Sequence, residues 1–284
     1  MPTPLSNGIL LKSARPARIS RKSSKNLLLT TGKSNWRLNM SDNLKGKTAL
    51  VTGSSRGLGK IIAGRFLEEG ANVVLTSQNE KELESAFSEL KDLSGNVLPV
   101  QADIRDGKQV AELVKKAVSE FGSLDILVNN AGVFKDGAVD QMELSDFELT
   151  FDVGVKGAFL STRETVRQMK KQKGGQIINI CSIGSKLGLE NLSAYCASKG
   201  ALARFGDSLK IELKPYGIRV TNIFPHSMNT MGRDIDENSK ERMRMIEPHD
   251  VADAILMVVT SKRYVQYQDI TIFPYSTSLT KTEE

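Results

Sequence analysis

The clearest structural signal in this 284-residue chain is the stretch TALVTGSSRGLG, residues 48–59. Its first five residues, Thr48–Thr52, form an apolar run typical of a buried strand. The run passes into a turn with three glycines, and a helical pattern follows over residues 60–69. Glycines at such a turn let the backbone approach a pyrophosphate and leave the first helical amides free to bind it. The stretch therefore predicts a nucleotide-binding βα unit.

The same alternation of apolar runs and helical patterns continues along the chain. Between two runs, for example, residues 106–121 repeat apolar side chains at helical spacing. Repeated βαβ units build a parallel sheet with helices on both faces. We therefore expect an α/β fold of the doubly wound Rossmann type, in a single domain of residues 41–284. The seven predicted strands are residues 48–52, 72–76, 97–101, 124–129, 176–181, 219–223 and 270–273.

The composition, 39% apolar and 25% charged, is typical of a globular protein. No apolar run approaches the ~18 residues that a membrane span needs, so no membrane partner is expected. Cys181 and Cys196 have no metal-ligand spacing with the two histidines, His226 and His249. We interpret them as reduced packing residues and expect no metal site.

Residues 1–40 hold eight basic side chains and no acidic one, whereas the other 244 residues carry 31 basic and 33 acidic side chains. The body thus has a net charge of −2, and no nucleic-acid partner is expected. The N-terminal segment lacks periodicity and is predicted to be a disordered extension. It is either a transit peptide, which implies a plastid or mitochondrion, or sequence upstream of a true start at Met40, which implies a cytoplasmic protein.

A second signal combines Ser182, Tyr195 and Lys199. Tyr195 and Lys199 are one helical turn apart, so on a helix both side chains project from the same face. An ammonium beside a phenol stabilises the phenolate and lowers the tyrosine pKa from its usual ~10. The three residues are therefore predicted to form a catalytic set with Tyr195 as general acid and base.

Five motifs in order resemble the short-chain dehydrogenase/reductase family, in the branch that includes 3-oxoacyl-carrier-protein reductases. The resemblance covers roughly residues 44–275. It implies an enzyme that acts on a CH–OH group with NAD(P), interconverting a small-molecule ketone, aldehyde or 3-oxoacyl carbonyl and its alcohol by hydride transfer. The motifs are Thr52-Gly53-x-x-x-Gly57-x-Gly59, Asp103-Ile104, Asn129-Asn130-Ala131-Gly132, Ser182 and Tyr195-x-x-x-Lys199.

The resemblance also implies roles. Tyr195 would protonate the carbonyl oxygen, Lys199 would lower its pKa and bind the nicotinamide ribose, and Ser182 would orient the substrate oxygen. A homodimer or homotetramer is expected, with an interface on helices near residues 146–172 and 193–214. The predicted cofactor-binding residues are Gly53, Ser55, Arg56, Gly57, Leu58, Gly59, Ser77, Asp103, Ile104, Asn130, Ala131, Gly132, Tyr195, Lys199, Pro225 and Thr230.

The end of the second strand distinguishes the two nicotinamide cofactors. A carboxylate there normally binds the ribose 2′-hydroxyl of NAD(H), but this strand ends Leu75-Thr76-Ser77-Gln78. Arg56 in the glycine turn offers a charge-assisted partner for a 2′-phosphate. We therefore predict NADP(H) over NAD(H); alternatively, Arg56 is a solvated loop residue and either cofactor binds.

The chain departs from the family pattern at two positions. Gly154 stands where the family has a helical asparagine that relays protons to the lysine, and glycine costs a helix interior ~1 kcal/mol relative to alanine. His226 replaces the glycine that usually follows Pro225, and it is either a substrate-binding or proton-transfer group or a hydrogen-bonded spacer. Gly154 and His226 motivate an alternative function, a catalytically impaired nucleotide-binding regulatory or scaffold protein. Residues 231–247, which contain three methionines, are expected to form a substrate lid.

Overall fold

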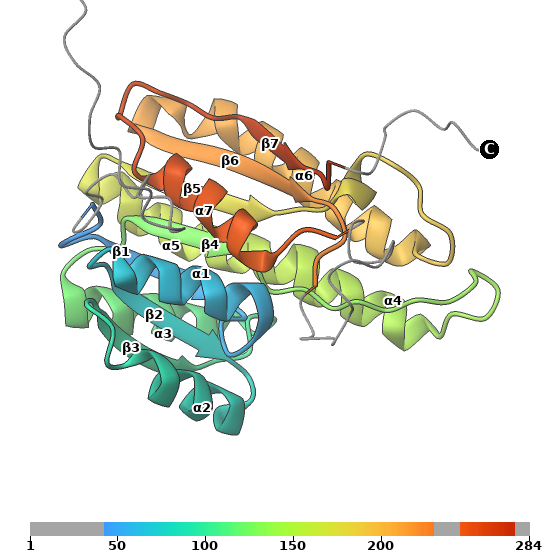
Figure 1. The fold of residues 1–284 in the computed structure, drawn as a ribbon, viewed down its shortest axis with the longest axis horizontal. Helices are drawn as coiled ribbons and strands as arrows, with labels where there is room; N and C mark the ends of the chain where they lie inside the picture. The colour runs from blue at the N-terminus through green and yellow to red at the C-terminus, as the bar shows by residue number, and fades with distance from the viewer. Residues whose placement is uncertain (1–42, 230–244, 276–284) are drawn as a thin grey trace, which may run out of the picture. The chain divides into compact units, whose positions relative to one another are not determined.

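The computed structural model describes residues 43–229 and 245–275, all within one compact unit. Seven parallel strands form one sheet in the order β3-β2-β1-β4-β5-β6-β7 (Figure 1). The order reverses between β1 and β4, which makes the fold doubly wound, as predicted. The strands are β1 (Thr48–Thr52), β2 (Asn72–Ser77), β3 (Asn96–Gln101), β4 (Ile126–Asn129), β5 (Gly175–Ile180), β6 (Ile218–Pro225) and β7 (Asp269–Ile272).

Helices cover both faces of this sheet, and α1 and α7 lie side by side across one of them (Figure 1). Successive strand side chains point to opposite faces. In β1, Val51 therefore packs in the core cluster beneath α1, α2 and α7, whereas Leu50 packs in the cluster beneath α3, α5 and α6. The α-helices are α1 (Gly57–Glu68), α2 (Glu80–Leu90), α3 (Gly107–Phe121), α4 (Leu144–Phe151), α5 (Ala158–Gln172), α6 (Ser193–Glu212) and α7 (Pro248–Val259).

Two element boundaries differ from the prediction because a polar side chain lies at the end of the element. Asp106, predicted to begin a helix, lies just before α3, and its carboxylate accepts from the amides of Lys108 and Gln109. The strand predicted at 124–129 begins at Ile126 instead. Asp125 accepts from the Thr48 amide through its carboxylate, so its side chain serves as a strand-end partner.

A chain of buried asparagines crosses the sheet on the side of α5 and α6. Asn129, Asn179 and Asn222 are direct partners on β4, β5 and β6. The amide of Asn129 donates to Thr162 (3.0 Å) and to Asn179 (2.9 Å), Asn179 donates to Asn222 (3.0 Å), and Asn222 donates to the Ala203 carbonyl (3.1 Å). This asparagine ladder ties three strands to two helices inside an otherwise apolar layer.

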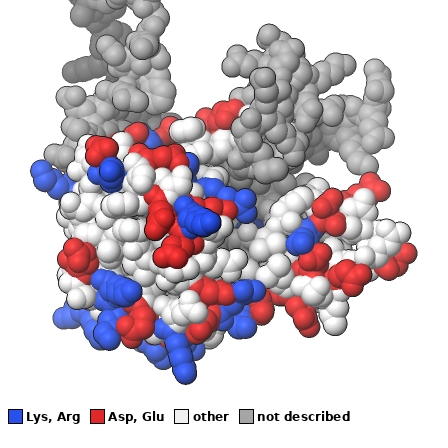
Figure 2. Space-filling model, turned by 90° about the horizontal axis from the view of Figure 1, so that it is seen from below, with Lys and Arg blue, Asp and Glu red and all other residues white. Residues whose placement is uncertain are grey.

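Several sequence-based expectations concern parts of the chain without a structural description. The described residues do not include the N-terminal extension, Thr230 or lid residues 231–244. The predicted compartment depends on that extension and stays a prediction. Within the described ranges no helix is long and apolar enough to cross a membrane, and no cluster of three potential metal ligands occurs. Both cysteines are free, and burial raises the pKa of the Cys181 thiol to about 12. Figure 2 shows basic and acidic side chains interspersed on one face of the molecule.

Candidate active site

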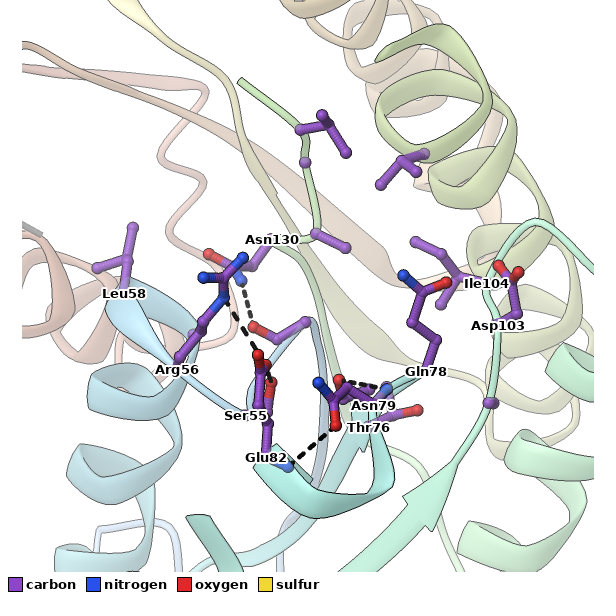
Figure 3. Close-up of a pocket in the computed structure, with 18 residues that line it drawn as sticks. Ser55, Arg56, Leu58, Thr76, Gln78, Asn79, Glu82, Asp103, Ile104 and Asn130 are labelled. Atoms are coloured by element: carbon purple, nitrogen blue, oxygen red, sulfur yellow. Dashed lines mark hydrogen bonds and ion pairs between the residues drawn. The ribbon is translucent and has the colours of Figure 1, made fainter. Parts of the chain in front are cut away.

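A cavity of about 390 Å³ opens at the carboxyl ends of the strands, where the strand order reverses (Figure 3). Its walls come from the glycine turn after β1, the ends of β2 and β3, and the segment after β4. Gly57 lies in the same turn but does not line the cavity. The predicted cofactor-binding residues that line it are Gly53, Ser55, Arg56, Leu58, Gly59, Ser77, Asp103, Ile104, Asn130, Ala131 and Gly132.

The turn needs its glycines for two different reasons. Gly53 and Gly57 have φ angles of 64° and 55°, which L side chains rarely adopt. At Gly59 a Cβ atom would overlap the Gly53 carbonyl oxygen and come within 2.5 Å of the Asn130 amide nitrogen. That amide donates to the carbonyls of Thr52 (2.9 Å) and Gly53 (3.1 Å). Asn130 thus shapes the turn as well as lining the cavity.

Arg56 has a partner that the sequence did not reveal. Its Nε atom lies 3.7 Å from Glu82 Oε2, and the Ser55 hydroxyl donates to the same oxygen at 3.1 Å. Figure 3 shows both side chains pointing toward the Glu82 carboxylate. The Arg56 side chain is 80% exposed, so this ion pair is weak and open to exchange. Glu82 is on α2, and only the fold brings it to the glycine turn.

Asp103 is fixed at the edge of the cavity by Arg105. The guanidinium donates to both carboxylate oxygens, with Nη2 2.6 Å from Oδ2. These hydrogen bonds lower the pKa of Asp103, so its carboxylate stays ionised. An ionised, oriented carboxylate is a hydrogen-bond acceptor suited to an exocyclic amine, such as that of adenine.

The predicted catalytic residues lie around the end of β5. Tyr195 and Lys199 occupy one face of α6, and Ser182 precedes a short 3₁₀ helix, η2 (Ile183–Ser185). Lys199 is 6% exposed and donates from Nζ to the Ile180 carbonyl at 2.7 Å. A Cβ atom on Gly132 would lie 3.3 Å from that ammonium. Lys199 therefore sits directly behind a wall of the first cavity.

A second cavity, of about 340 Å³, contains both Ser182 and Tyr195. The Tyr195 ring meets the ring of Phe134 edge-on, with centroids 5.2 Å apart. Pro225, the last residue of β6, lines neither this cavity nor the first, although the next residue does line this one. The remaining described lining residues are Ile183, Leu189, Leu192, His226, Ser227, Met228, Asn229 and Met245.

Residues 47–241 match the family model described as short chain dehydrogenase. The chain belongs to the short-chain dehydrogenase family. An uncharacterized oxidoreductase of Staphylococcus aureus (strain USA300) is 32% identical over 231 residues, which cover 81% of this chain and 98% of that protein. This short-chain dehydrogenase is accordingly an oxidoreductase, as predicted.

Two solved structures place this short-chain dehydrogenase among cofactor-bound relatives. A metagenomic short-chain oxidoreductase in complex with NADP has a TM-score of 0.71 and 29% identity, covering 81% of this chain and 97% of that one. A 3-ketoacyl-(acyl-carrier-protein) reductase of Brucella melitensis complexed with NADH has a TM-score of 0.74 and 30% identity, covering 81% and 98%.

Gly154 occupies a different kind of helix from the one expected in this short-chain dehydrogenase. It is buried within a π-helical segment, η1 (Asp152–Gly157), that joins α4 to α5. A Cβ atom there would lie 3.6 Å from Ser198 Oγ and 3.8 Å from Ser198 Cβ, which is ordinary contact. A small side chain at this position would therefore fit beside the residue that precedes Lys199.

Gly154→Ala is expected to raise the free energy of unfolding by about 0.5–1 kcal/mol, because alanine restricts the unfolded chain without a clash. The melting temperature should rise by ~2–4 °C. Gly206→Ala is the matched control, since its Cβ would overlap Asn222 Oδ1 and come within 2.6 Å of Asn179 Nδ2. That variant should lose about 1–3 kcal/mol. Destabilisation by both substitutions would contradict the packing described for Gly154.

Proposed function

We propose that the protein is an NADP(H)-dependent oxidoreductase that interconverts a carbonyl compound and its alcohol, with Tyr195 as general acid and base. The observation that carries this proposal is the position of Lys199 between the two cavities. Its ammonium lies beside Gly132, which lines the first cavity. Lys199 also follows Tyr195, which lines the second cavity, by one turn of α6. Such a lysine serves both a nucleotide in the first cavity and a tyrosine facing a substrate in the second.

The first cavity fits a dinucleotide. Its glycine turn stands at the amino end of α1, where free amides favour a pyrophosphate, and the ionised Asp103 stands where adenine would need an acceptor. When bound, the cofactor supplies the hydride. Gly53, Ser55 and Gly59 would hold its phosphates, whereas Asn130 and Ala131 would line its ribose.

The catalytic residues have the hydrogen-bonding capacity that this chemistry needs. Ser182 Oγ accepts from the Gly184 amide at 3.1 Å, which leaves its hydroxyl proton to donate to a substrate oxygen. Lys199 uses one of its three protons on Ile180, which leaves two for the Tyr195 phenolate and a cofactor ribose. Tyr195 donates its proton to the carbonyl oxygen as the carbon receives hydride, and Lys199 stabilises the resulting phenolate.

NADP(H) is preferred to NAD(H) because of what surrounds the end of β2. Ser77, Gln78 and Asn79 supply no carboxylate there. The carboxylate of Glu82 on α2 also lines the cavity, but the exposed Arg56 can exchange it for a 2′-phosphate. The relatives are divided, since one solved structure holds NADP and the other NADH. The preference of this chain for NADP(H) is therefore inferred from Arg56.

Arg56→Ala is expected to raise the ratio of KM for NADPH to KM for NADH by about 10–100-fold, because one charge-assisted hydrogen bond to the phosphate is lost. Glu82→Gln should lower the same ratio, since it removes the carboxylate that competes for Arg56. Steady-state kinetics with both cofactors at a fixed carbonyl concentration measures the ratio. Equal changes for both cofactors in Arg56→Ala would contradict the proposal.

The alternative of a catalytically impaired regulatory or scaffold protein is less well supported. It rested on Gly154 and His226, but the named relatives are oxidoreductases. Ser182 and Tyr195 also share one cavity, which a protein without turnover would not need.

The expected homodimer or homotetramer is supported by apolar side chains exposed on the helices proposed for the interface. They are Leu144 and Phe147 on α4, Phe159 on α5 and Ile211 on α6. Burying exposed aromatic and aliphatic side chains favours association. Analytical ultracentrifugation measures the state, and a monomer at micromolar concentration would refute this part of the proposal.

A further inference from the structure

Two residues that line the second cavity each have a buried polar atom without a partner. His226 Nδ1 and Asn229 Oδ1 are buried and make no hydrogen bond, and both residues line the cavity. Buried polar atoms in native proteins are almost always paired, because an orphaned donor or acceptor costs stability. Two such atoms, on residues three positions apart that line one cavity, indicate that a polar group of a bound ligand forms the missing hydrogen bonds.

The backbone holds both residues in place, so their side chains are free to serve a ligand. The His226 amide donates to the Ile272 carbonyl at 3.0 Å, and its ring packs against Phe273 with centroids 5.1 Å apart. The Asn229 amide donates to the Ile246 carbonyl at 3.2 Å. Burial lowers the pKa of His226, so the ring is neutral near pH 7 and has one donor and one acceptor nitrogen.

The described residues that line this cavity offer no counter-ion to a charged ligand. Its described lining residues include no Asp, Glu, Lys or Arg, and most of them are apolar. A carboxylate, phosphate or ammonium group entering this space would lose hydration without gaining a counter-ion from these described residues. The polar group that meets His226 and Asn229 should therefore be neutral.

We propose that the substrate is an uncharged hydroxy-carbonyl compound whose carbonyl meets Ser182 and Tyr195 and whose hydroxyl bonds to His226 and Asn229. This inference rests on the proposed function. A hydroxyl has one proton to donate and lone pairs to accept with, so it can donate to Asn229 Oδ1 while it accepts from His226 Nδ1 when the ring carries its proton on that nitrogen. Hydride from the cofactor forms the new C–H bond, and the Tyr195 proton forms the new O–H bond. The products are a diol and the oxidised cofactor, and the second hydroxyl is unchanged.

The experiment compares 2-hexanone with its hydroxy derivatives, which carry the hydroxyl at carbon 1, 3, 4 or 5, using the full chain and NADPH. The measured quantity is the ratio of kcat/KM for each hydroxyketone to that for 2-hexanone. At least one isomer should give a ratio of about 10–100, as expected for a hydroxyl that satisfies buried partners. A ratio near one for every isomer overturns the inference.

Two variants test the residues independently. His226→Phe keeps a ring against Phe273 but removes both nitrogens, and Asn229→Leu removes the amide at similar size. Each should bring the ratio close to one, whereas His226→Gln, which retains a donor and an acceptor, should preserve most of it. Ser227→Ala is the matched control on the same wall and should leave the ratio as it is. An unchanged ratio in both His226→Phe and Asn229→Leu overturns the inference, and thermal melting identifies a variant that has not folded.

The outcomes separate this inference from the proposed function. If 2-hexanone is reduced in a Tyr195-dependent manner but no hydroxyketone is favoured, only the hydroxyl site is wrong. If neither kind of ketone consumes NADPH in a Tyr195-dependent manner, the proposed function fails and the hydroxyl site fails with it.

Discussion

Replacing Tyr195 by phenylalanine is expected to lower kcat for carbonyl reduction by about 10²–10⁴-fold, which is the usual contribution of a positioned general acid. The substitution removes only the hydroxyl, so the ring contact with Phe134 persists and the cavity keeps its shape. Lys199 would remain bonded to the Ile180 carbonyl. The loss should therefore fall on proton transfer rather than on folding.

Two measurements locate that loss. NADPH consumption with a reactive carbonyl reports turnover, and the fluorescence of bound NADPH reports the cofactor site, where the dissociation constant should change by less than ~5-fold. Tyr216→Phe is the control, because Tyr216 is exposed on a turn after α6 and its ring faces Lys170. Full activity in Tyr195→Phe would rule out the proposed role of the tyrosine.

Asn179→Ala is expected to give the largest loss of stability, about 3–5 kcal/mol. Asn179 is the middle of the asparagine ladder and is fully buried. Its removal leaves the side-chain oxygen of Asn222, Oδ1, without its donor. It also removes one of the two acceptors of the Asn129 side-chain amide. An orphaned buried group costs about 1–3 kcal/mol, and the cavity left by the side chain adds to that cost. Urea denaturation measures the change as a shift of the midpoint.

Asn96→Ala provides the matched control. Asn96 also donates to an asparagine on the neighbouring strand, Asn72, at 2.8 Å, and the two residues are direct partners on β2 and β3. That pair lies on the exposed side, where water replaces a lost partner. The control should change the free energy of unfolding by about 0.5 kcal/mol or less. Similar losses for both variants would show that burial does not set the cost.

The sequence predicted the sheet well because its signals are local. Each strand is an apolar run, and each glycine in the first turn has a backbone requirement that follows from the turn itself. The spacing of Tyr195 and Lys199 brings both side chains to one face of any helix that contains them, and α6 is that helix. All seven strands accordingly overlap their predicted ranges, with ends that differ by at most two residues. At the start of β4 the difference arises because the Asp125 side chain accepts from the Thr48 amide.

The features that the sequence did not predict depend on contacts between distant segments. Glu82 meets Arg56 because α2 packs back toward the glycine turn. Asn229 reaches the second cavity because its backbone pairs with Ile246, seventeen positions later. The π-helical form of residues 152–157 is a local feature, but so short a segment has no periodic signature that would predict it. No single stretch of sequence contains this information.

The asparagine ladder has a further consequence for how the sheet assembles. Its three side-chain amides lie beside one another only when β4, β5 and β6 pair in the observed register. Sliding β5 by one residue would send Asn179 to the opposite face and leave an isoleucine between two polar groups. Parallel strands joined by long connections meet slowly during folding and sample many misaligned pairings. The buried asparagines make each misaligned pairing unfavourable, so the ladder favours the observed alignment of β4, β5 and β6. Ser182 follows β5 and His226 follows β6, so this alignment also positions both residues.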